Sequence, residues 1–417
     1  MKKLTVSQYL IVILSALAWA GMLNTGWLFS SYYALSQEAL GLSDATMGTL
    51  VSMIGLIGVV GYIFSGIFTD SLGYKLTTNI GMVITSIGAV ILMMNPTESM
   101  AIVCCALMCG GGVVFYCTAV LRMISATGGE GGSGRCLGYF YAIMGLFSLI
   151  EGTLFSRIIA INSAAAALRV MLIISVVSMI GCNLVVNFID KSSFLPSKNV
   201  AKAEDGFKFS QIGLLFKSPR FLALCIICFC TVSCSTLMTY TQPLLTSQFG
   251  LESSTVTLIG TWTNQGTILV LSTMTGYITD KIGSAAKMFV ISLSGLIVAC
   301  GIVLATPWQA SFVALVIFAM VLIKTGDAVG KPGRMILAGE CGLPESVRGT
   351  AIGFMSVVMA LPGMIFGQLF GSILTAYNNS RIGYQIIYII FIGIAVVGLL
   401  GVALFSRLKK AAAAKAA

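Results

Sequence analysis

Long apolar runs constrain this chain more than any other feature of its sequence. A helix needs about 20 predominantly apolar residues to cross roughly 30 Å of hydrocarbon, and runs of that length recur from end to end with short polar breaks. Hydrophobic residues make up 57% of the 417 positions and charged residues only 9%, whereas soluble proteins have about 25% charged residues. The pattern predicts an all-α integral membrane protein. Its twelve expected transmembrane helices lie at residues 8–33, 45–68, 76–95, 99–123, 136–160, 165–189, 220–245, 254–278, 286–305, 309–335, 349–374 and 383–406.

The basic residues predict the orientation of the chain, because Lys and Arg in short loops are retained on the cytoplasmic side of a membrane. When both termini are placed in the cytoplasm, the basic residues between and beyond the spans fall on that side, apart from Arg157, Arg169 and Arg381. Topology and attraction to anionic lipid therefore explain the net charge of +10, and no nucleic-acid partner is expected.

Twelve cysteines occur in a chain that has no histidine. Most of them lie inside the apolar spans, where small side chains help helices to pack closely. Cys225 and Cys228 form a C-x-x-C pair within a span, without a second pair to complete a metal site. We therefore expect packing cysteines, no metal and no cofactor.

A short loop sequence is repeated. GIFTDSLGYK, residues 66–75, closes the second expected span, and GYITDKIGSA, residues 276–285, closes the eighth, at an offset of 210 residues. RMISA after Leu121 likewise recurs as RMILA after Gly333. The repeat predicts two homologous six-span halves in parallel orientation. The expected domains are an N-terminal bundle at 1–189, a cytoplasmic linker at 190–219, a C-terminal bundle at 220–408 and a tail at 409–417.

The repeated loop resembles that of the major facilitator superfamily, whose signature between spans two and three is G-x-x-x-D-x-x-G-x-[RK]. The first copy fits in full, and the second lacks only the last basic residue. The resemblance covers essentially the whole chain. It implies two pseudo-symmetric six-helix bundles that rock about a central cavity, lined chiefly by the first, fourth, seventh and tenth spans. Residues 340–374 look like a bacterial branch of organic-solute permeases, which implies a multi-pass monomer of the bacterial cytoplasmic (inner) membrane and no enzyme activity.

The aspartates of the two loop copies are expected to hold the cytoplasmic side shut. An aspartate at the end of one helix is stabilised by the positive N-terminus of another. Asp70 is therefore expected against the start of span eleven near Arg348, and Asp280 against the start of span five near Arg135.

Other charges at the cytoplasmic ends of the spans are candidates for the same gate. Arg122 and Asp190, at the ends of spans four and six, are expected to join Asp70 in a charge cluster. Arg334, near the cytoplasmic surface, is grouped with them, although reaching the headgroups explains its charge as well. The alternative is a solvated loop with incidental charges.

Three charges lie deep in the spans. Lys324 and Asp327, within LIKTGDAVGKPGR at residues 322–334, are too deep to reach the headgroups easily, and each costs several kcal/mol if unpaired. Glu151 lies about 15 residues into the fifth span. Lys324 is a candidate partner for Glu151, as a bridge between the halves, or for Asp327 on its own helix face, and both pairings stay open.

The three deep charges sum to minus one if all are ionised. One carboxylate is therefore expected to take up a proton or to have another partner. A protonatable carboxylate that faces a water-filled cavity is a way to couple a proton gradient to transport. The alternative is a structural ion pair unrelated to the substrate.

Other polar residues at similar depth are candidates to bind solute by hydrogen bonds and stacking, although packing between helices explains any single one equally well. They are Asn24, Trp27, Tyr116, Tyr240, Gln242, Asn264 and Gln265.

A deep lysine in a chain with few other deep cations favours a small organic anion, a carboxylate or sulfonate, as the solute of a secondary active transporter. The motifs of drug/proton antiporters and sugar porters are missing. The expected partners are a small-molecule substrate, the bilayer, and protons or a counter-transported anion. Two alternatives stay open: a proton-coupled exporter of a hydrophobic cation or drug, and a transporter-like sensor that moves nothing.

Overall fold

The computed structural model describes residues 4–128, 133–190, 212–267, 269–270 and 285–416, and the regular secondary structure of these residues is helical throughout. Ten of the described helices are long and apolar enough to cross a membrane. They coincide with ten of the twelve predicted spans, and the other two, 254–278 and 309–335, fall on helices that are described only in part. The prediction of an all-α integral membrane protein is confirmed.

The helices group by their contacts into two compact units, which are described separately. Unit 1 consists of Met1–Lys202 with Ser253–Thr261, and unit 2 of Ala203–Glu252 with Trp262–Ala417. The helices of unit 1 are α1 (Val6–Gly26), α2 (Leu28–Ser31), α3 (Tyr33–Leu40), α4 (Asp44–Leu72), α5 (Tyr74–Leu92), α6 (Glu98–Gly110), η1 (Gly111–Tyr116), α7 (Cys117–Gly128), α8 (Ser133–Ile161), α9 (Ala164–Ile189) and α12 (Ser253–Thr261). Those of unit 2 are α10 (Ile212–Phe216), α11 (Pro219–Ser247), η3 (Trp262–Gly266), α14 (Ala285–Ala305), η4 (Ala310–Phe312), α15 (Val313–Gly339), α16 (Glu345–Ala376) and α17 (Arg381–Ala416).

One helix, α12, groups with unit 1 although it follows the first helices of unit 2 in the sequence. It packs against α8, where Ser156 Oγ donates a hydrogen bond of 2.8 Å to the carbonyl oxygen of Ser254. Gly152 allows this approach, because a Cβ at that position would overlap the side chain of Thr261. The domain limits expected from the sequence stay a prediction beside this division.

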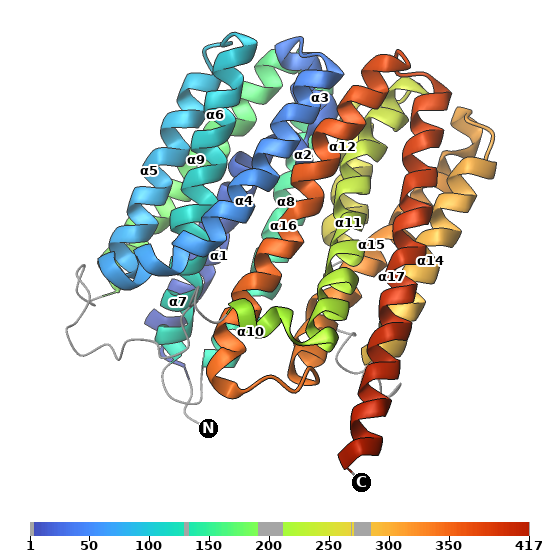
Figure 1. Ribbon diagram of the computed structural model, residues 1–417. Helices are drawn as coiled ribbons and strands as arrows, with labels where there is room; N and C mark the ends of the chain where they lie inside the picture. The colour runs from blue at the N-terminus through green and yellow to red at the C-terminus, as the bar shows by residue number, and fades with distance from the viewer. Residues whose placement is uncertain (1–3, 129–132, 191–211, 268, 271–284, 417) are drawn as a thin grey trace. The chain divides into compact units, whose positions relative to one another are not determined.

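Unit 1 has a core of buried side chains between α1, α7, α8 and α9. Trp19 of α1 packs its ring edge-on against Phe140 of α8, with 5.6 Å between the ring centroids. In Figure 1 α1 runs beside α9, and α5 beside α6, which agrees with the contacts between these helices.

A π-helical segment, η1, interrupts the fourth span. Gly111 of η1 lies close to α5, since a Cβ there would lie 2.5 Å from the carbonyl oxygen of Gly81.

Unit 2 has its own core, around Phe221, Leu293, Met355 and Phe405. α11 packs against α15, α16 and α17, and α14 packs against α15 and α17 (Figure 1). Aromatic rings add to the contact between α16 and α17, where the rings of Phe370 and Phe391 lie 5.4 Å apart.

Capping side chains explain where several helices begin. Thr5 and Gln8 form a capping box at α1: Gln8 N donates to Thr5 Oγ1 at 3.3 Å, and Thr5 N donates to Gln8 Oε1 at 2.8 Å. Ser43 and Ser163 cap α4 and α9 through their hydroxyls, which accept hydrogen bonds from the N–H groups of Thr46 and Ala166. Ser218 caps α11, with Pro219 at its first helical position.

The repeated loop contains a glycine that its turn requires. Gly73 ends α4 with φ of 79°, in the region that glycine adopts without strain, and its N–H donates to the carbonyl oxygen of Thr69 at 3.1 Å. The second glycine of GIFTDSLGYK therefore closes one helix and starts the next. Residues 276–284 of the second copy lie outside the described residues, and its last residue, Ala285, begins α14.

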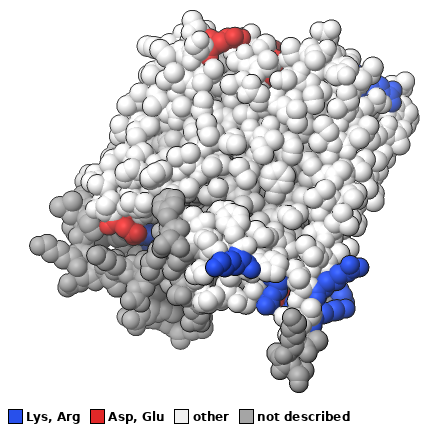
Figure 2. Space-filling model, in the orientation of Figure 1, with Lys and Arg blue, Asp and Glu red and all other residues white. Residues whose placement is uncertain are grey.

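The surface is consistent with a lipid environment. In Figure 2 the charged side chains visible on this face lie toward the ends of the helices, and the area between them is uncharged. Large apolar side chains such as Val177 and Leu400, 64% and 65% exposed, stand on this outer surface. A soluble protein does not expose so much continuous apolar area, whereas a membrane-spanning one faces lipid with it.

Candidate functional site

The deep carboxylate of unit 1 is held by neutral side chains. Glu151 of α8 is 7% exposed, and its Oε2 accepts a hydrogen bond of 2.7 Å from Asn24 Nδ2 of α1. Asn24 Oδ1 in turn accepts a bond of 2.9 Å from the hydroxyl of Tyr32, whose ring packs edge-on against Phe155. A carboxylate in apolar surroundings with neutral partners is costly when ionised. The arrangement suits a group that gains and loses a proton.

The deep cation of unit 2 also has a neutral hydrogen-bond partner. Lys324 of α15 is 4% exposed, and its Nζ donates to Ser235 Oγ of α11 at 3.3 Å. Several other hydroxyls of α11 bond back to their own helix, as Thr231 does to the carbonyl oxygen of Ile227 at 2.7 Å. Asp327 lies in α15, and its side chain is outside the described residues. Its pairing with Lys324 therefore stays a prediction, as does the pairing of Lys324 with Glu151.

Tyr116 and Trp27 border η1 in unit 1. Tyr116 is fully buried beside Trp19, with 5.9 Å between the ring centroids, and within the described part of the chain its hydroxyl has no hydrogen-bond partner. Trp27 follows α1 and is half-buried, and a Cβ on Gly112 of η1 would lie 3.6 Å from its ring. π-Helical segments are frequent at functional sites, and solute contacts of Tyr116 and Trp27 stay a prediction.

The remaining candidates of unit 2 lie on α11 and η3. The hydroxyl of Tyr240 donates to the carbonyl oxygen of Gly367 at 2.5 Å, so this side chain joins α11 to α16. Gln242 is buried two residues further along α11, whereas Asn264 and Gln265 are half-buried in η3. The contact of Tyr240 favours a structural role for it over a role in binding solute.

Two ion pairs stand at one end of unit 1. Asp70, at the end of α4, pairs with Arg122 of α7, and both side chains are largely exposed. Asp190 pairs instead with Lys75, the last residue of the loop motif, at 3.8 Å. Lys75 is 2% exposed and also donates to the carbonyl oxygens of Asn187 and Asp190 at the end of α9, where a cation is stabilised by the helix dipole.

The structure therefore brings Arg122 to Asp70 and gives Asp190 another partner. The other predicted gate residues cannot be followed in it: the side chains of Arg135, Arg334 and Arg348, and all of Asp280, lie outside the described residues. The helix-end contacts proposed for Asp70 and Asp280 stay predictions.

The cysteines match the expectation of thiols inside helices. All but Cys182 and Cys225 are buried, and each carries a thiol rather than a disulfide. Across the described residues, no three His, Cys, Asp or Glu side chains gather as a metal site requires.

The protein family follows from the whole sequence. A sequence profile described as Major Facilitator Superfamily matches residues 9–367. The chain belongs to this superfamily. It is a membrane transporter rather than an enzyme.

One relative found by sequence and two solved structures support the superfamily fold. The inner membrane protein YqcE of Escherichia coli (strain K12) is 22% identical over 346 residues, which are 80% of this chain and 79% of that protein. A variant of the nucleoside transporter NupG has a TM-score of 0.78 at 15% identity, with 96% of this chain and 100% of that chain covered. A POT family transporter in complex with a thioalcohol-conjugated peptide has a TM-score of 0.70 at 14% identity, with 97% and 96% covered. At these identities the structures demonstrate the fold alone.

Three residues of this superfamily member were missed from the sequence, namely Tyr32, Ser235 and Lys75. Tyr32 and Ser235 complete the surroundings of the two deep charges, but hydroxyl side chains are common in membrane helices and most bond to their own backbone. Lys75 carried a usable signal, since it is the basic residue of the superfamily loop motif. The motif alone did not indicate that the Lys75 side chain is buried.

Proposed function

We propose that this transporter moves a small organic anion, a carboxylate or a sulfonate, by rocker-switch alternating access of two helical bundles. The observation that carries the proposal is the depth of a buried cation: Lys324 is 4% exposed, and Ser235 Oγ is one of its hydrogen-bond partners. It lies eleven residues after Val313, the first residue of α15, or about 16 Å along the helix. That is about halfway through a hydrocarbon core of roughly 30 Å.

A lysine at this depth needs compensation from something other than water. An ammonium group inside a membrane costs several kcal/mol unless an anion or a water-filled cavity is near it. The carboxylate or sulfonate of a solute provides that anion in the loaded state, and Asp327 is a candidate to provide it in the empty state. Exchange between the two anions makes binding reversible, which a transporter requires.

Glu151 is proposed to couple transport to protons. Its carboxylate has Asn24 as its described partner, so proton uptake removes a buried charge and leaves one hydrogen bond to rearrange. Protons or a counter-transported anion then complete the cycle. We further propose that the protein lies in the bacterial cytoplasmic (inner) membrane with both termini in the cytoplasm. The inner-membrane relative and the predominance of basic residues on one side support this location.

Counterflow in proteoliposomes tests the anion proposal. Lys324→Gln preserves much of the side-chain length and removes the charge, and we expect it to abolish saturable counterflow of a carboxylate substrate while the purified protein stays folded. Lys287→Gln is the matched control, because it removes an exposed lysine from α14 of the same unit. The substrate itself is found first by thermal-shift screening of carboxylates, sulfonates, amino acids and lipophilic cations, since a ligand stabilises in proportion to RT ln(1 + [L]/Kd).

Double variants separate an anion site from a structural pair. If Lys324 only neutralises a carboxylate, then Lys324→Gln combined with Asp327→Asn or with Glu151→Gln regains both stability and transport. A cation that binds substrate is not replaced by deletion of its counter-charge, so full recovery in either double variant contradicts the proposal.

Export of a hydrophobic cation or drug is the second candidate function. The buried position of Glu151 beside neutral Asn24 favours it, because such a carboxylate also suits a cationic solute. The net charge of the solute decides between the two functions. If lipophilic cations and no anions give saturable counterflow that Glu151→Gln abolishes, the second function replaces the first.

A further inference from the structure

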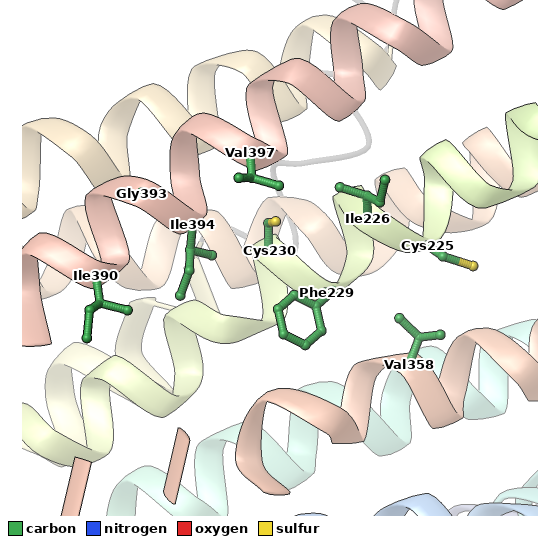
Figure 3. Close-up of a pocket in the computed structure, with 9 residues that line it drawn as sticks. All are labelled: Cys225, Ile226, Phe229, Cys230, Val358, Ile390, Gly393, Ile394 and Val397. Carbon is green, nitrogen blue, oxygen red and sulfur yellow. The ribbon is translucent and has the colours of Figure 1, made fainter. Parts of the chain in front are cut away.

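An apolar groove runs between three helices of unit 2. It lies between α11, α16 and α17, has a volume of about 560 Å³, and is lined by apolar side chains and cysteines that Figure 3 labels. Ile226 of α11 and Val397 of α17 line it and are 37% and 51% exposed, so the groove opens on the outside of the unit. Its lining offers a polar solute no charged or amide group, whereas a hydrocarbon chain suits it.

Close approaches of α17 to α11 fix how the two helices are aligned. A Cβ on Gly398 would lie 2.9 Å from Cys230 Cβ, and a Cβ on Gly401 would lie 3.1 Å from Ile226 Cγ2. Later residues of α17 therefore meet earlier residues of α11, and the two helices are antiparallel. The start of α11 consequently lies at about the level of Arg407 in α17.

Basic residues gather at that level. Lys217 precedes α11, and Arg407 and Lys410 stand near the end of α17, all three exposed. An acid described at this end, Glu340, is already engaged: Lys409 Nζ pairs with Glu340 Oε2 at 2.8 Å. Figure 2 shows Lys and Arg side chains together near the C-terminus. We call Lys217, Arg407 and Lys410 the basic rim.

The rim and the groove are separated by the depth of one lipid leaflet. From Val397 to Arg407 there are ten residues of one continuous helix, or about 15 Å. Half of a hydrocarbon core of roughly 30 Å has the same thickness. A molecule with an anionic headgroup and an acyl chain therefore reaches both features at once.

We propose that the groove is a binding site for an anionic phospholipid, with one acyl chain along α11 and α17 and the phosphate at the basic rim. Basic residues next to a membrane surface attract anionic lipid by about 1 kcal/mol each, or about fivefold in affinity. A zwitterionic lipid fits the groove equally well and gains little from the rim. The site is independent of the solute site and of the proposed transport function.

The test uses the full-length protein in detergent, titrated with dioleoyl phosphatidylglycerol or dioleoyl phosphatidylcholine, with the midpoint of thermal unfolding as the readout. We expect saturable stabilisation by phosphatidylglycerol and at least tenfold weaker binding of phosphatidylcholine. The double variant Arg407→Gln/Lys410→Gln is expected to bind phosphatidylglycerol about 20-fold more weakly. Arg157→Gln/Arg169→Gln, which removes two exposed arginines from unit 1, is the control and keeps the native affinity.

A second variant fills the groove without touching the charges. A Cβ on Gly393 meets nothing within 4 Å, so Gly393→Leu places its side chain in the groove and is expected to weaken phosphatidylglycerol binding more than tenfold. Gly301→Leu of α14 is the matched control, because its Cβ also meets nothing within 4 Å. If Gly393→Leu does not fold, Val397→Phe makes the same steric test at an exposed position.

Three results overturn the proposal. Equal stabilisation by the two lipids removes the role of the rim, and so does native affinity in Arg407→Gln/Lys410→Gln. Native affinity in a folded groove-filling variant shows that the lipid binds elsewhere.

Discussion

The charges at the helix ends of unit 1 and the charges deep in the spans have different partners. At the ends, carboxylates pair with cations: Asp70 with Arg122, and Asp190 with Lys75. Each pair is locally neutral, and the two differ in burial: Asp70 and Arg122 are 49% and 40% exposed, whereas Lys75 is 2% exposed. Such pairs connect helices and contribute modestly to stability, according to how far each is buried.

In the middle of the spans the described hydrogen bonds join a charged group to a neutral one. Asn24 donates to Glu151, and Lys324 donates to Ser235. A neutral partner orients a charge without cancelling it, so proton uptake at Glu151 removes a buried charge that Asn24 does not neutralise. We expect the helix-end charges to hold the structure and the deep charges to take part in transport.

Among tests of the difference between helix-end and deep charges, Glu151→Gln is expected to have the largest effect, which is on proton-driven transport. If the carboxylate carries the coupled proton, proton-driven accumulation of solute falls more than tenfold and loses its dependence on pH, while counterflow persists because it needs no net proton movement. Accumulation driven by an imposed pH gradient in proteoliposomes measures this. Glu98→Gln, at an exposed carboxyl in the first turn of α6, is the control. An unaltered pH dependence in Glu151→Gln rules out Glu151 as the coupling group.

Lys75→Met is expected to have the largest effect on stability. Lys75 is 2% exposed, and its loss leaves Asp190 and the last carbonyl groups of α9 without their cation. The cost is about 2 to 3 kcal/mol, seen as a lower midpoint of thermal unfolding in detergent. Arg122→Gln, in the exposed pair, costs less than about 1 kcal/mol. Equal costs for the two substitutions would mean that burial does not distinguish the pairs.

Gly73→Ala is expected to cost about 1 kcal/mol or slightly more, because alanine at φ of 79° is strained. The neighbouring Gly66→Ala is its control: a Cβ on Gly66, inside α4, meets nothing within 4 Å. We expect that variant to be as stable as the native protein or slightly more stable, since alanine favours a helix. Thermal unfolding of both variants measures the difference. A loss of stability in Gly73→Ala alone shows that the turn requires glycine at this position.

The smallest effect on stability is expected for Asp70→Asn, because Asp70 and Arg122 are 49% and 40% exposed. Its effect on gating is expected to be clearer. Loss of the charge loosens the cytoplasmic closure, so maleimide labelling of cysteines from that side becomes faster. Ser71→Ala, at the next residue, keeps the charge and is expected to label at the native rate. Native labelling in Asp70→Asn argues against a gate at this loop. Asp280→Asn is expected to behave like Asp70→Asn.

Much of the fold was predictable from local patterns. The apolar runs gave the positions of the spans, because a bilayer requires helices of nearly constant length. Gly73 was recognisable as part of a motif, and its positive φ explains why glycine is needed there.

The candidate site was less predictable from the sequence than the fold. Asn24 and Glu151 were separate candidates 127 positions apart, and nothing in their spacing indicated a bond between them.

By itself the sequence determined the membrane class of the protein, its spans, its internal repeat and its superfamily, because each of these depends on composition or on residues near one another in the chain. Only the tertiary structure decided which side chains hold the deep charges, that Lys75 rather than Arg122 meets Asp190, and that α12 packs with α8. These contacts depend on the rotation of each helix about its axis and on which helix lies beside it. Packing between distant segments sets both, and a pattern along a single segment does not contain that information.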